Sequence, residues 1–261
     1  LLGTNEEFEV LCREAAKYGI GIVLDGVFSH TGSDSRYFNR EGRYGDGGAY
    51  RDPNSPYRSW YDFDPKYKGG YRSWWGFETL PEVNEENPSY VEFITGEGGV
   101  IDTWLRRGAA GFRLDVADEL PDDFIEKIRA AVKRVSPEKF LLGEVWEDAT
   151  TKYGFGQRRT YLLGKGLDSV MNYPFKNAVL DFVKGKPAEQ AMGEILSICE
   201  HYPAPAMDTA LNFLSTHDTE RALTVIADEP ANGRGREWQS GRCVTGEAYE
   251  EGMLRLRMAY A

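Results

Sequence analysis

Arg113 and Asp115 are the first residues whose type and spacing suggest chemistry. They stand two residues apart in the segment Gly111–Glu119, where apolar side chains alternate with them. This alternation predicts a strand, and side chains two residues apart on a strand share a face. A buried arginine beside a buried aspartate is costly unless each satisfies the other or a third group. The pair therefore indicates either a structural ion pair or part of an active site at the end of a strand.

Other apolar runs also end in polar side chains. We expect further strands at residues 20–28, 140–146, 167–173 and 211–215. The acidic and imidazole groups at the ends of these runs include Asp25, His30, Glu144, His217 and Asp218. The carboxyl ends of parallel strands meet at one edge of a barrel, where barrel enzymes place their chemistry. A barrel would therefore bring these groups and the Arg113–Asp115 pair around one pocket.

Predicted helices separate these strands. They lie at about residues 4–18, 89–107, 122–135, 175–200 and 250–261. The alternation of strand and helix predicts an α/β fold, with a parallel sheet and helices outside it. Residues 31–86 interrupt this alternation, because they are rich in Gly, Tyr, Arg, Asp and Pro and lack clear periodicity. So long a connection inside a compact domain is usually functional or a small insert.

Carboxylates that converge with one arginine suit the cleavage of a glycosidic bond. In that reaction two carboxyl groups flank the bond, one as nucleophile and the other as acid and then base. Arg113 would keep Asp115 ionised, as a nucleophile needs. The apolar neighbours of Glu144 would favour its protonated form, as an acid catalyst needs. Aromatic residues make up 13% of the chain, and Trp74 and Trp75 either stack on a sugar or pack the insert.

Five motifs, in order along the chain, resemble those of the α-amylase family of glycoside hydrolases. They are Asp25–His30, Leu80–Asn84, Gly111–Glu119, Gly143–Trp146 and Ser215–Asp218. Their order and rough spacing agree with the family across almost the whole chain. Within the family, the chain is similar to the neopullulanase, amylopullulanase and maltogenic amylase branch. The segments that carry this likeness are Trp74–Gly76, Leu80–Asn84 and Val116–Glu119.

The resemblance implies a retaining hydrolase that cleaves α-glucosidic bonds in starch-derived oligosaccharides or polysaccharides by double displacement. It makes Asp115 the nucleophile, Glu144 the general acid/base and Asp218 the stabiliser of the transition state. The substrate-binding residues that it implies are Arg113, His30, His217, Asp25, Glu119 and Trp146.

The resemblance also implies an incomplete (β/α)8 TIM barrel over residues 1–261, with residues 31–86 as an insert after the first visible strand. The first two strands, the eighth strand and a C-terminal β-domain would be absent, so we expect that this chain alone cannot close the barrel. No cofactor is required and no metal ligand is assigned, while calcium would belong to the absent N-terminal part. Ser29 stands where many relatives carry Asn, so a metal-ligating or supporting role is not carried over to it.

Two other kinds of function stay open beside hydrolysis: another reaction on the same scaffold, and a role without catalysis. A transglycosylase or a sugar isomerase on the same scaffold would share every catalytic residue. A non-catalytic barrel for carbohydrate binding or assembly is disfavoured, because such relatives lose the catalytic carboxylates, whereas Asp115, Glu144 and Asp218 are all present. The motifs do not distinguish α-1,4 from α-1,6 bonds.

The composition of the chain disfavours some classes of binding partner. The net charge of −11 and the lack of a basic stripe disfavour nucleic acid and anionic membranes, which leaves an α-glucan oligosaccharide as the expected partner. No run is apolar enough to span a membrane. Cys12, Cys199 and Cys243 form neither a metal-binding spacing nor a disulfide framework. Low cysteine use favours a cytoplasmic location, with secretion as the alternative, and no oligomeric state is implied.

Overall fold

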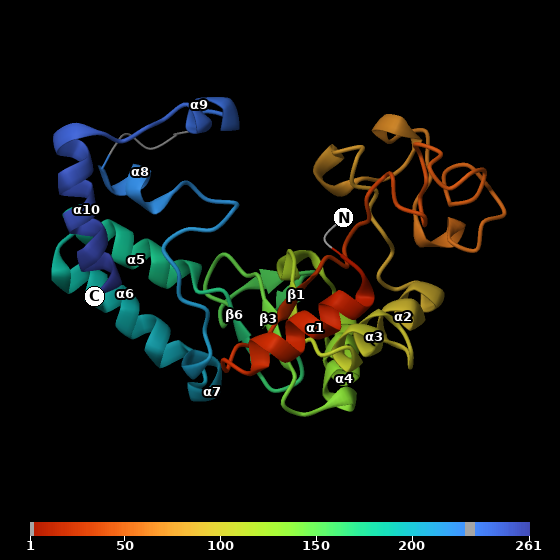
Figure 1. The fold of residues 1–261 in the computed structure, drawn as a ribbon, viewed down its shortest axis with the longest axis horizontal. Coiled ribbons are helices and arrows are strands. Elements are labelled where there is room, and N and C mark those ends of the chain that lie inside the picture. The colour runs from red at the N-terminus through yellow and green to blue at the C-terminus, as the bar shows by residue number, and fades with distance from the viewer. Residues whose placement is uncertain (1–2, 228–232) are drawn as a thin grey trace. The chain divides into compact units, whose positions relative to one another are not determined.

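The computed structural model describes residues 3–227 and 233–261 of the chain (Figure 1). The chain divides into two compact units. The first contains residues up to 144 together with residues 153–168, and the second contains residues 145–152 and the chain from residue 169 onward. Each unit has its own packing and is described by itself.

The first unit combines a parallel sheet, helices and a long insert. Its helices are α1 (Asn5–Ala16), α2 (Pro88–Thr95), α3 (Val100–Arg106) and α4 (Asp122–Val135). Its strands are β1 (Val23–Gly26), β2 (Gly111–Leu114), β3 (Phe140–Gly143), β4 (Tyr153–Gly154) and β5 (Gln157–Arg158). Short 3₁₀ turns are η1 (Arg58–Trp60), η2 (Lys68–Gly70), η3 (Trp74–Gly76) and η4 (Ala117–Glu119).

Strand β2 lies between β1 and β3, and the three strands run parallel. Asp25 on β1 is the register partner of Arg113 on β2. The ladder continues past the strand ends, because the Asp115 amide donates to the last carbonyl of β1 (3.2 Å) and the Glu144 amide donates to the last carbonyl of β2 (3.0 Å). Backbone pairing therefore brings four predicted site residues to the same edge of the sheet. This parallel sheet with flanking helices confirms the predicted α/β class.

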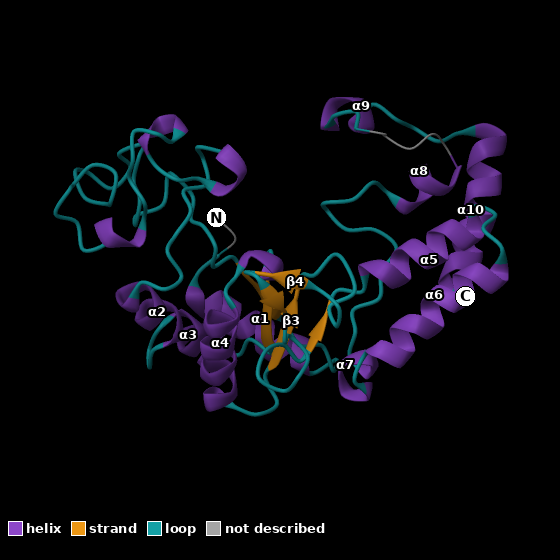
Figure 2. Cartoon of the chain, turned by 180° about the vertical axis from the view of Figure 1, so that it is seen from behind, coloured by secondary structure: helices purple, strands orange, loops and turns teal. Residues whose placement is uncertain are grey.

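Helix α4 has the span that the sequence predicted, Asp122 to Val135. Its buried residues are Phe124, Ile125, Ile128, Ala131 and Val132, which recur at helical spacing along one face. Acidic side chains occupy its first turn, and Lys133 and Arg134 occupy its last, which suits the helix dipole. Helices α2, α3 and α4 pack against one another, as Figure 2 shows, and α4 contacts β3.

The single helix predicted over residues 89–107 is wrong, because the structure has two helices there, α2 and α3. Asn87 caps α2 by accepting the amides of Ser89 and Tyr90. The chain then leaves the helix through a Gly-rich segment in which Gly98 has a φ of 73°. Left-handed backbone suits glycine and interrupts a right-handed helix.

Residues 31–86 form an insert with an aromatic core of its own, drawn in orange in Figure 1. Its buried aromatic residues are Phe38, Trp60, Tyr61 and Tyr71. The Phe38 ring is fully buried and contacts the rings of Tyr61 and Tyr71 at centroid distances of 4.8 and 4.7 Å. Aromatic rings bury a large area each, so this cluster stabilises a segment that has little regular secondary structure.

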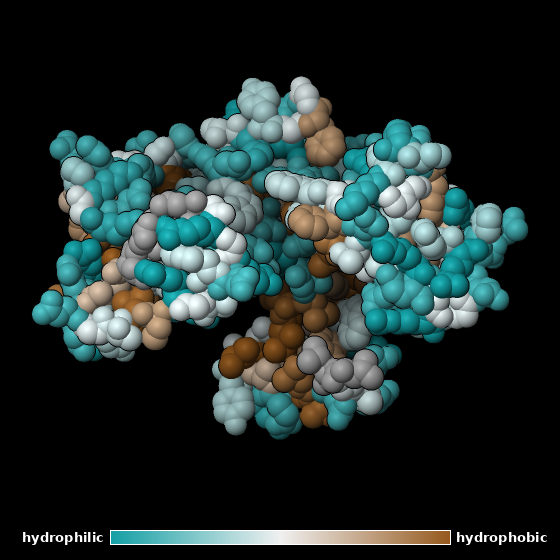
Figure 3. Space-filling model, turned by 90° about the horizontal axis from the view of Figure 1, so that it is seen from above, coloured by the Kyte–Doolittle hydropathy of each residue, from teal (hydrophilic) through white to brown (hydrophobic). Residues whose placement is uncertain are grey.

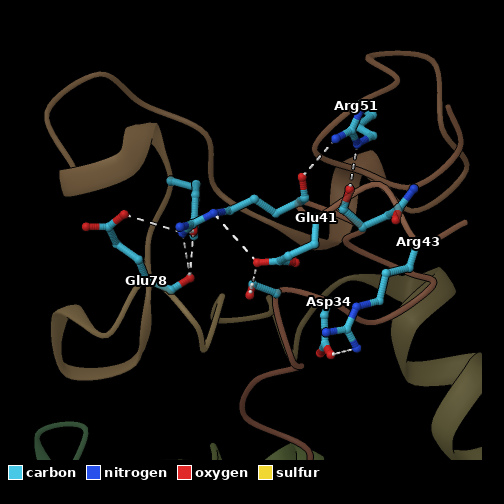
Figure 4. A network of polar contacts seen from close by, with 9 residues as sticks. Asp34, Glu41, Arg43, Arg51 and Glu78 are labelled. Atoms are coloured by element: carbon cyan, nitrogen blue, oxygen red, sulfur yellow. Dashed lines mark hydrogen bonds and ion pairs between the residues drawn. The ribbon is translucent and has the colours of Figure 1, made fainter. Parts of the chain in front are cut away.

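Polar contacts hold the loops of the insert around that core (Figure 4). Arg43 forms an ion pair with Asp34 (2.6 Å), and Arg40 forms one with Glu78 (3.3 Å). Arg51 donates through Nε to a backbone carbonyl at 3.2 Å. Exposed ion pairs are individually weak, so the network orders the loops more than it stabilises the fold.

An apolar groove of about 620 Å³ lies between α1 and the strands. Its lining includes Phe8, Leu11, Leu24, Trp104 and Phe112. Among the described residues, β1 pairs only with β2, so its other edge is unpaired. Nearby apolar side chains are exposed as well, Ile20 by 57% and Val23 by 42%, and hydrophobic surface appears in brown in Figure 3.

The second unit contains one short strand and a group of helices. They are β6 (Ser169–Val170), α5 (Tyr173–Val183), α6 (Ala188–His201), α7 (Ala204–Asp208), α8 (Ala222–Ala227), α9 (Arg236–Ser240) and α10 (Gly246–Tyr260). A cluster of Leu180, Val183, Leu214, Ala222 and Ile226 forms its core. Across residues 3–227 and 233–261, no helix is long and apolar enough to cross a membrane.

The strand predicted over residues 211–215 is reduced to a single parallel bridge between Leu211 and Met171. Its backbone bonds join Leu211 to Val170 (3.1 Å) and to Asn172 (3.0 Å). Leu211 is 45% exposed, so little burial supports a longer strand at this point. The strand predicted over residues 167–173 is likewise short and covers β6 alone.

Candidate active site

Arg113 is the centre of the site. Its Nη1 atom lies 2.6 Å from a carboxylate oxygen of Asp25 and 2.6 Å from one of Asp115, and its Nη2 atom lies 2.7 Å from Oε2 of Glu144. Burial by itself would lower the pKa of the Arg113 guanidinium, but the hydrogen bond and charges of these carboxylates outweigh burial and raise it. One planar cation, with an 11% exposed side chain, therefore binds three acidic groups.

Asp115 follows β2 directly, at the point where the backbone turns away from the sheet. The next residue, Val116, has φ and ψ of 38° and 49°, a left-handed conformation that is rare for a β-branched residue. Such strain costs about 1–3 kcal/mol and persists only where the surroundings determine it. Here the turn directs the Val116 amide to Oε2 of Glu144 at 2.9 Å. The strained residue thus helps to bring the two carboxyl groups together.

Glu144 follows β3 and is almost completely buried, with 3% of its side chain exposed. The sequence predicted an apolar environment that would favour its protonated form. That description is incomplete, because Oε2 contacts both the Arg113 guanidinium and the Val116 amide. Both groups come from β2 and the turn after it, so the neighbours of Glu144 in the sequence could not indicate them.

His30 lies beside this cluster within the first unit. Its Nδ1 atom is 2.9 Å from the Ser29 hydroxyl, and its ring stacks on Trp74 with centroids 5.4 Å apart. Burial lowers the pKa of His30, while the charges of Asp115 and Glu119 act in the opposite direction. His30 is therefore favoured as a neutral ring, which can accept or donate one hydrogen bond at Nε2 when Ser29 engages Nδ1.

Ser29 has a clear structural role. Its side chain is 2% exposed, and its hydroxyl is placed to bond the His30 ring. Its carbonyl accepts the amide of Val83 at 3.0 Å, which joins the end of β1 to the insert. Ser29 therefore holds the ring of His30 and links it to the insert.

Glu119 contacts two tryptophans of the insert. Its Oε2 atom accepts the indole N–H of Trp74 at 2.7 Å, and its Oε1 atom accepts that of Trp75 at 2.8 Å. Trp74 is half-buried, whereas Trp75 is 77% exposed. The alternatives for these residues were packing in the insert and stacking on a sugar. Trp74 packs against His30, whereas Trp75 presents its ring to solvent.

Glu85 is a further titratable group, which the sequence analysis did not identify. It lines a pocket of about 390 Å³ in the insert, with Ser59, Tyr61, Asp62, Arg72, Glu82, Val83 and Asn84. Burial raises the pKa of Glu85 to about 7, and the charge of Glu82 adds to this effect. No sequence signal distinguishes Glu85 from its exposed neighbour Glu86.

Trp146, His217 and Asp218 belong to the second unit and are described there. The Trp146 ring stacks on Tyr173 with centroids 4.2 Å apart. His217 Nε2 lies 3.0 Å from Oδ2 of Asp218, and the two side chains are 71% and 41% exposed. A turn positions them, in which the Asp218 amide donates to the Thr216 hydroxyl at 3.3 Å.

The structure thus brings Asp25, Asp115 and Glu144 into direct contact with Arg113, with His30 and Glu119 nearby in the same unit. Within residues 3–227 and 233–261, no group of three or more His, Cys, Asp or Glu side chains is placed to hold a metal ion. The fold and site define a class of protein: an α/β protein with acidic groups and an arginine at the carboxyl ends of parallel strands.

Comparisons with known proteins identify the family. A family model described as "Alpha amylase, catalytic domain" matches residues 2–239. The chain belongs to the α-amylase family, which confirms the resemblance seen in its motifs. The amylopullulanase of Thermoanaerobacterium saccharolyticum is 36% identical over an alignment of 263 positions, which covers 89% of this chain and 20% of that protein.

Two solved structures have the same fold as this chain. The cyclic α-maltosyl-(1→6)-maltose hydrolase of Arthrobacter globiformis aligns with a TM-score of 0.75 and 28% identity, over 87% of this chain and 48% of that one. The type III pullulan hydrolase of Thermococcus kodakarensis aligns with a TM-score of 0.77 and 26% identity, over 98% and 41%. The chain therefore spans about a fifth of the amylopullulanase and less than half of these structures. It contributes part of a TIM-barrel catalytic domain.

Proposed function

We propose that this chain carries the nucleophile and the general acid/base of a retaining hydrolase of α-glucans. The observation that supports this most directly is the binding of Asp115 and Glu144 to one guanidinium, at 2.6 and 2.7 Å. Retaining glycosidases need two carboxyl groups about 5–5.5 Å apart, whereas inverting enzymes separate them by about 6.5–9.5 Å to admit a water. Sharing one guanidinium favours the closer arrangement.

In the first step Asp115 attacks the anomeric carbon of the sugar. The bond between that carbon and the glycosidic oxygen breaks, and the proton of the Glu144 carboxyl group passes to the leaving oxygen. The sugar is then an ester of Asp115, and Glu144 is a carboxylate. Arg113 favours this step because its hydrogen bond to Asp115, at 2.6 Å, orients the carboxylate for the attack.

In the second step water replaces Asp115. Glu144 takes one proton from a water molecule, the water oxygen bonds to the anomeric carbon, and the ester bond to Asp115 breaks. Two inversions return the starting anomeric configuration, and both carboxyl groups regain their initial states. Every proton and leaving group is accounted for by the chain and water, so we propose that the reaction requires no cofactor.

The remaining site residues take the roles that membership of the family suggests. Asp218 would stabilise the positive charge of the transition state, and His30 and His217 would hydrogen-bond the sugar at the point of cleavage. Asp25 would support the network through Arg113, to which it is bound at 2.6 Å. Trp146 would lie on the leaving-group side. The names of the relatives support an α-glucan substrate, such as pullulan or a maltodextrin.

The test is proton NMR of maltotriose and of pullulan, each incubated with the full-length natural polypeptide that carries this chain. We expect the α-anomer to appear first in the products. Early β-anomer would contradict the double displacement. An absence of net hydrolysis, with isomerised or transferred sugars as products, would replace hydrolysis by isomerisation or transglycosylation on the same residues.

A further inference from the structure

The two oxygens of Glu119 are engaged by two indole rings from a distant segment of the chain. Trp74 donates its indole N–H to one oxygen at 2.7 Å, and Trp75 donates its indole N–H to the other at 2.8 Å. Indole N–H groups only donate, and a carboxylate only accepts, so each contact is a charge-assisted hydrogen bond. Glu119 therefore joins the turn after β2 to the insert, 44 residues earlier in the chain.

The loop that carries the two tryptophans is closed at its base. Ser73 and Pro81 form a backbone bridge, and the Trp74 amide donates to the Leu80 carbonyl at 2.9 Å. Within the loop Trp75 has a φ of 51°, in the left-handed region that a bulky residue rarely adopts. A residue held in this way needs a fixed partner, and the bond to Glu119 supplies one.

The two rings have different surroundings. The Trp74 ring stacks on His30, with centroids 5.4 Å apart at 30°, and also on Phe77 at 6.2 Å. Trp75 contacts Trp74 at 5.6 Å and is 77% exposed. The exposed ring of Trp75 thus contacts Trp74, which in turn stacks on His30. Burial lowers the pKa of the His30 ring, and His30 lies close enough to Asp115 for the charge of Asp115 to oppose that effect.

We propose that Glu119 is a positioning residue, which holds the Trp74–Trp75 pair so that the exposed ring of Trp75 stacks on a glucose unit of the α-glucan. This inference rests on the proposed function, because the ligand is the substrate of the same site. It changes the role of Glu119, which the sequence suggested as a direct contact of the sugar. A flat ring that is anchored by its N–H and open on its face suits the apolar face of a pyranose.

Substitutions can distinguish a positioning role of Glu119 from a direct contact between Glu119 and the sugar. In Glu119→Gln one oxygen acceptor stays and the other becomes an NH₂ donor, which cannot accept an indole N–H. One tryptophan then loses its anchor. In Trp75→Gly the ring is lost, but the left-handed backbone is retained, because glycine adopts positive φ freely. Glu86→Gln and Tyr44→Ala are matched controls, since both side chains are exposed and lie elsewhere in the insert.

The experiment measures kcat and KM for maltoheptaose on the full-length polypeptide, with the single variants and the double variant Glu119→Gln/Trp75→Gly. Aromatic contacts of this kind contribute about 0.5–1.5 kcal/mol, which is a change of about 2- to 13-fold. We expect Trp75→Gly to raise KM within that range and Glu119→Gln to raise it by less, with kcat within about twofold. The double variant should match Trp75→Gly, since Glu119 acts through the ring.

Three results would overturn the inference. The first is a KM in Trp75→Gly equal to that of the Tyr44→Ala control. The second is a double variant whose losses simply add, because Glu119 would then act independently of the Trp75 ring. The third is an effect of Glu119→Gln no larger than that of Glu86→Gln. If the unsubstituted polypeptide turns over no α-glucan, the proposed function itself fails, and this outcome is distinct from the other three.

Discussion

Two regions of the molecule carry the proposed catalytic carboxylates, and they hold them in different ways. Asp115 and Glu144 follow paired strands and share one guanidinium, with 20% and 3% of their side chains exposed. Asp218 is 41% exposed and is held by a turn around Thr216, with His217 Nε2 at 3.0 Å from its Oδ2 atom. Sheet pairing and a buried cation therefore preorganise the first two groups, whereas local turn bonds hold the third.

This difference predicts which substitutions lower the stability of the fold and which lower activity alone. A group inside a buried ion network cannot be removed without leaving other charges unpaired. A group at an exposed turn can be removed with little effect on the fold. The following predictions test this contrast, from the largest expected effect to the smallest.

Asp115→Ala should abolish turnover, with kcat reduced by about 10⁴-fold or more, because no other group would attack the anomeric carbon. Binding of maltooligosaccharides should be largely retained, since the rest of the site stays in place. Steady-state kinetics and calorimetric titration measure the two quantities. Near-normal turnover would mean that the nucleophile is assigned wrongly.

Arg113→Met should destabilise the fold by about 3–5 kcal/mol, because it leaves three acidic groups without their cation. Asp218→Asn should change the free energy of unfolding by less than about 0.5 kcal/mol while it impairs catalysis. Urea denaturation compares the two variants under one set of conditions. If the Arg113→Met variant does not fold, Arg113→Lys takes its place in the comparison. Arg113→Lys should be less stable than Asp218→Asn. Equal stabilities would remove the contrast between the two regions.

Glu85→Gln should make the protein more stable at pH 8, by on the order of 1–3 kcal/mol. The pKa of Glu85 is raised to about 7 in the folded state, from an ordinary value of 4.5. Between these values the folded state keeps a proton that the unfolded state releases, so stability falls as pH rises through the window. At pH 4 Glu85 is protonated in both the folded and the unfolded state. The variant and the unsubstituted protein should therefore have the same free energy of unfolding at this pH.

The measurement for Glu85 is the difference in unfolding free energy between the variant and the unsubstituted protein from pH 4 to pH 8. This difference cancels the contributions of other titrating groups, including His30, to the unfolding free energy, because both proteins contain those groups. Glu86→Gln is the matched control, because Glu86 is exposed. A difference that does not grow with pH, or that the control reproduces, would contradict the prediction.

Ser29→Ala should cost about 1–2 kcal/mol, since it leaves the half-buried His30 ring without its hydroxyl partner at Nδ1. The effect on KM should be modest, because the ring still stacks on Trp74. Thermal unfolding and kinetics check the two parts. A variant as stable as the unsubstituted protein would show that the bond contributes nothing.

Much of the first unit could be predicted, because strand periodicity and strand ends are local properties of the chain. The alternation around Arg113 indicated a strand with charges on one face, and β2 is that strand. The helix boundaries at residues 96–99 were missed even though glycines mark them. The strand over residues 211–215 was overestimated, because a strand's length depends on its partners as well as on its own apolar residues.

The sequence by itself determined the family and the class of fold, and it indicated which acidic groups lie at strand ends, because residue types in a fixed order carry that information. Only the tertiary structure decided which groups touch. Glu144 accepts the amide of a left-handed Val116, and Glu119 binds two indoles from an insert 44 residues earlier. Backbone amides and remote rings leave no mark in the spacing of residues, since their positions depend on how distant segments pack.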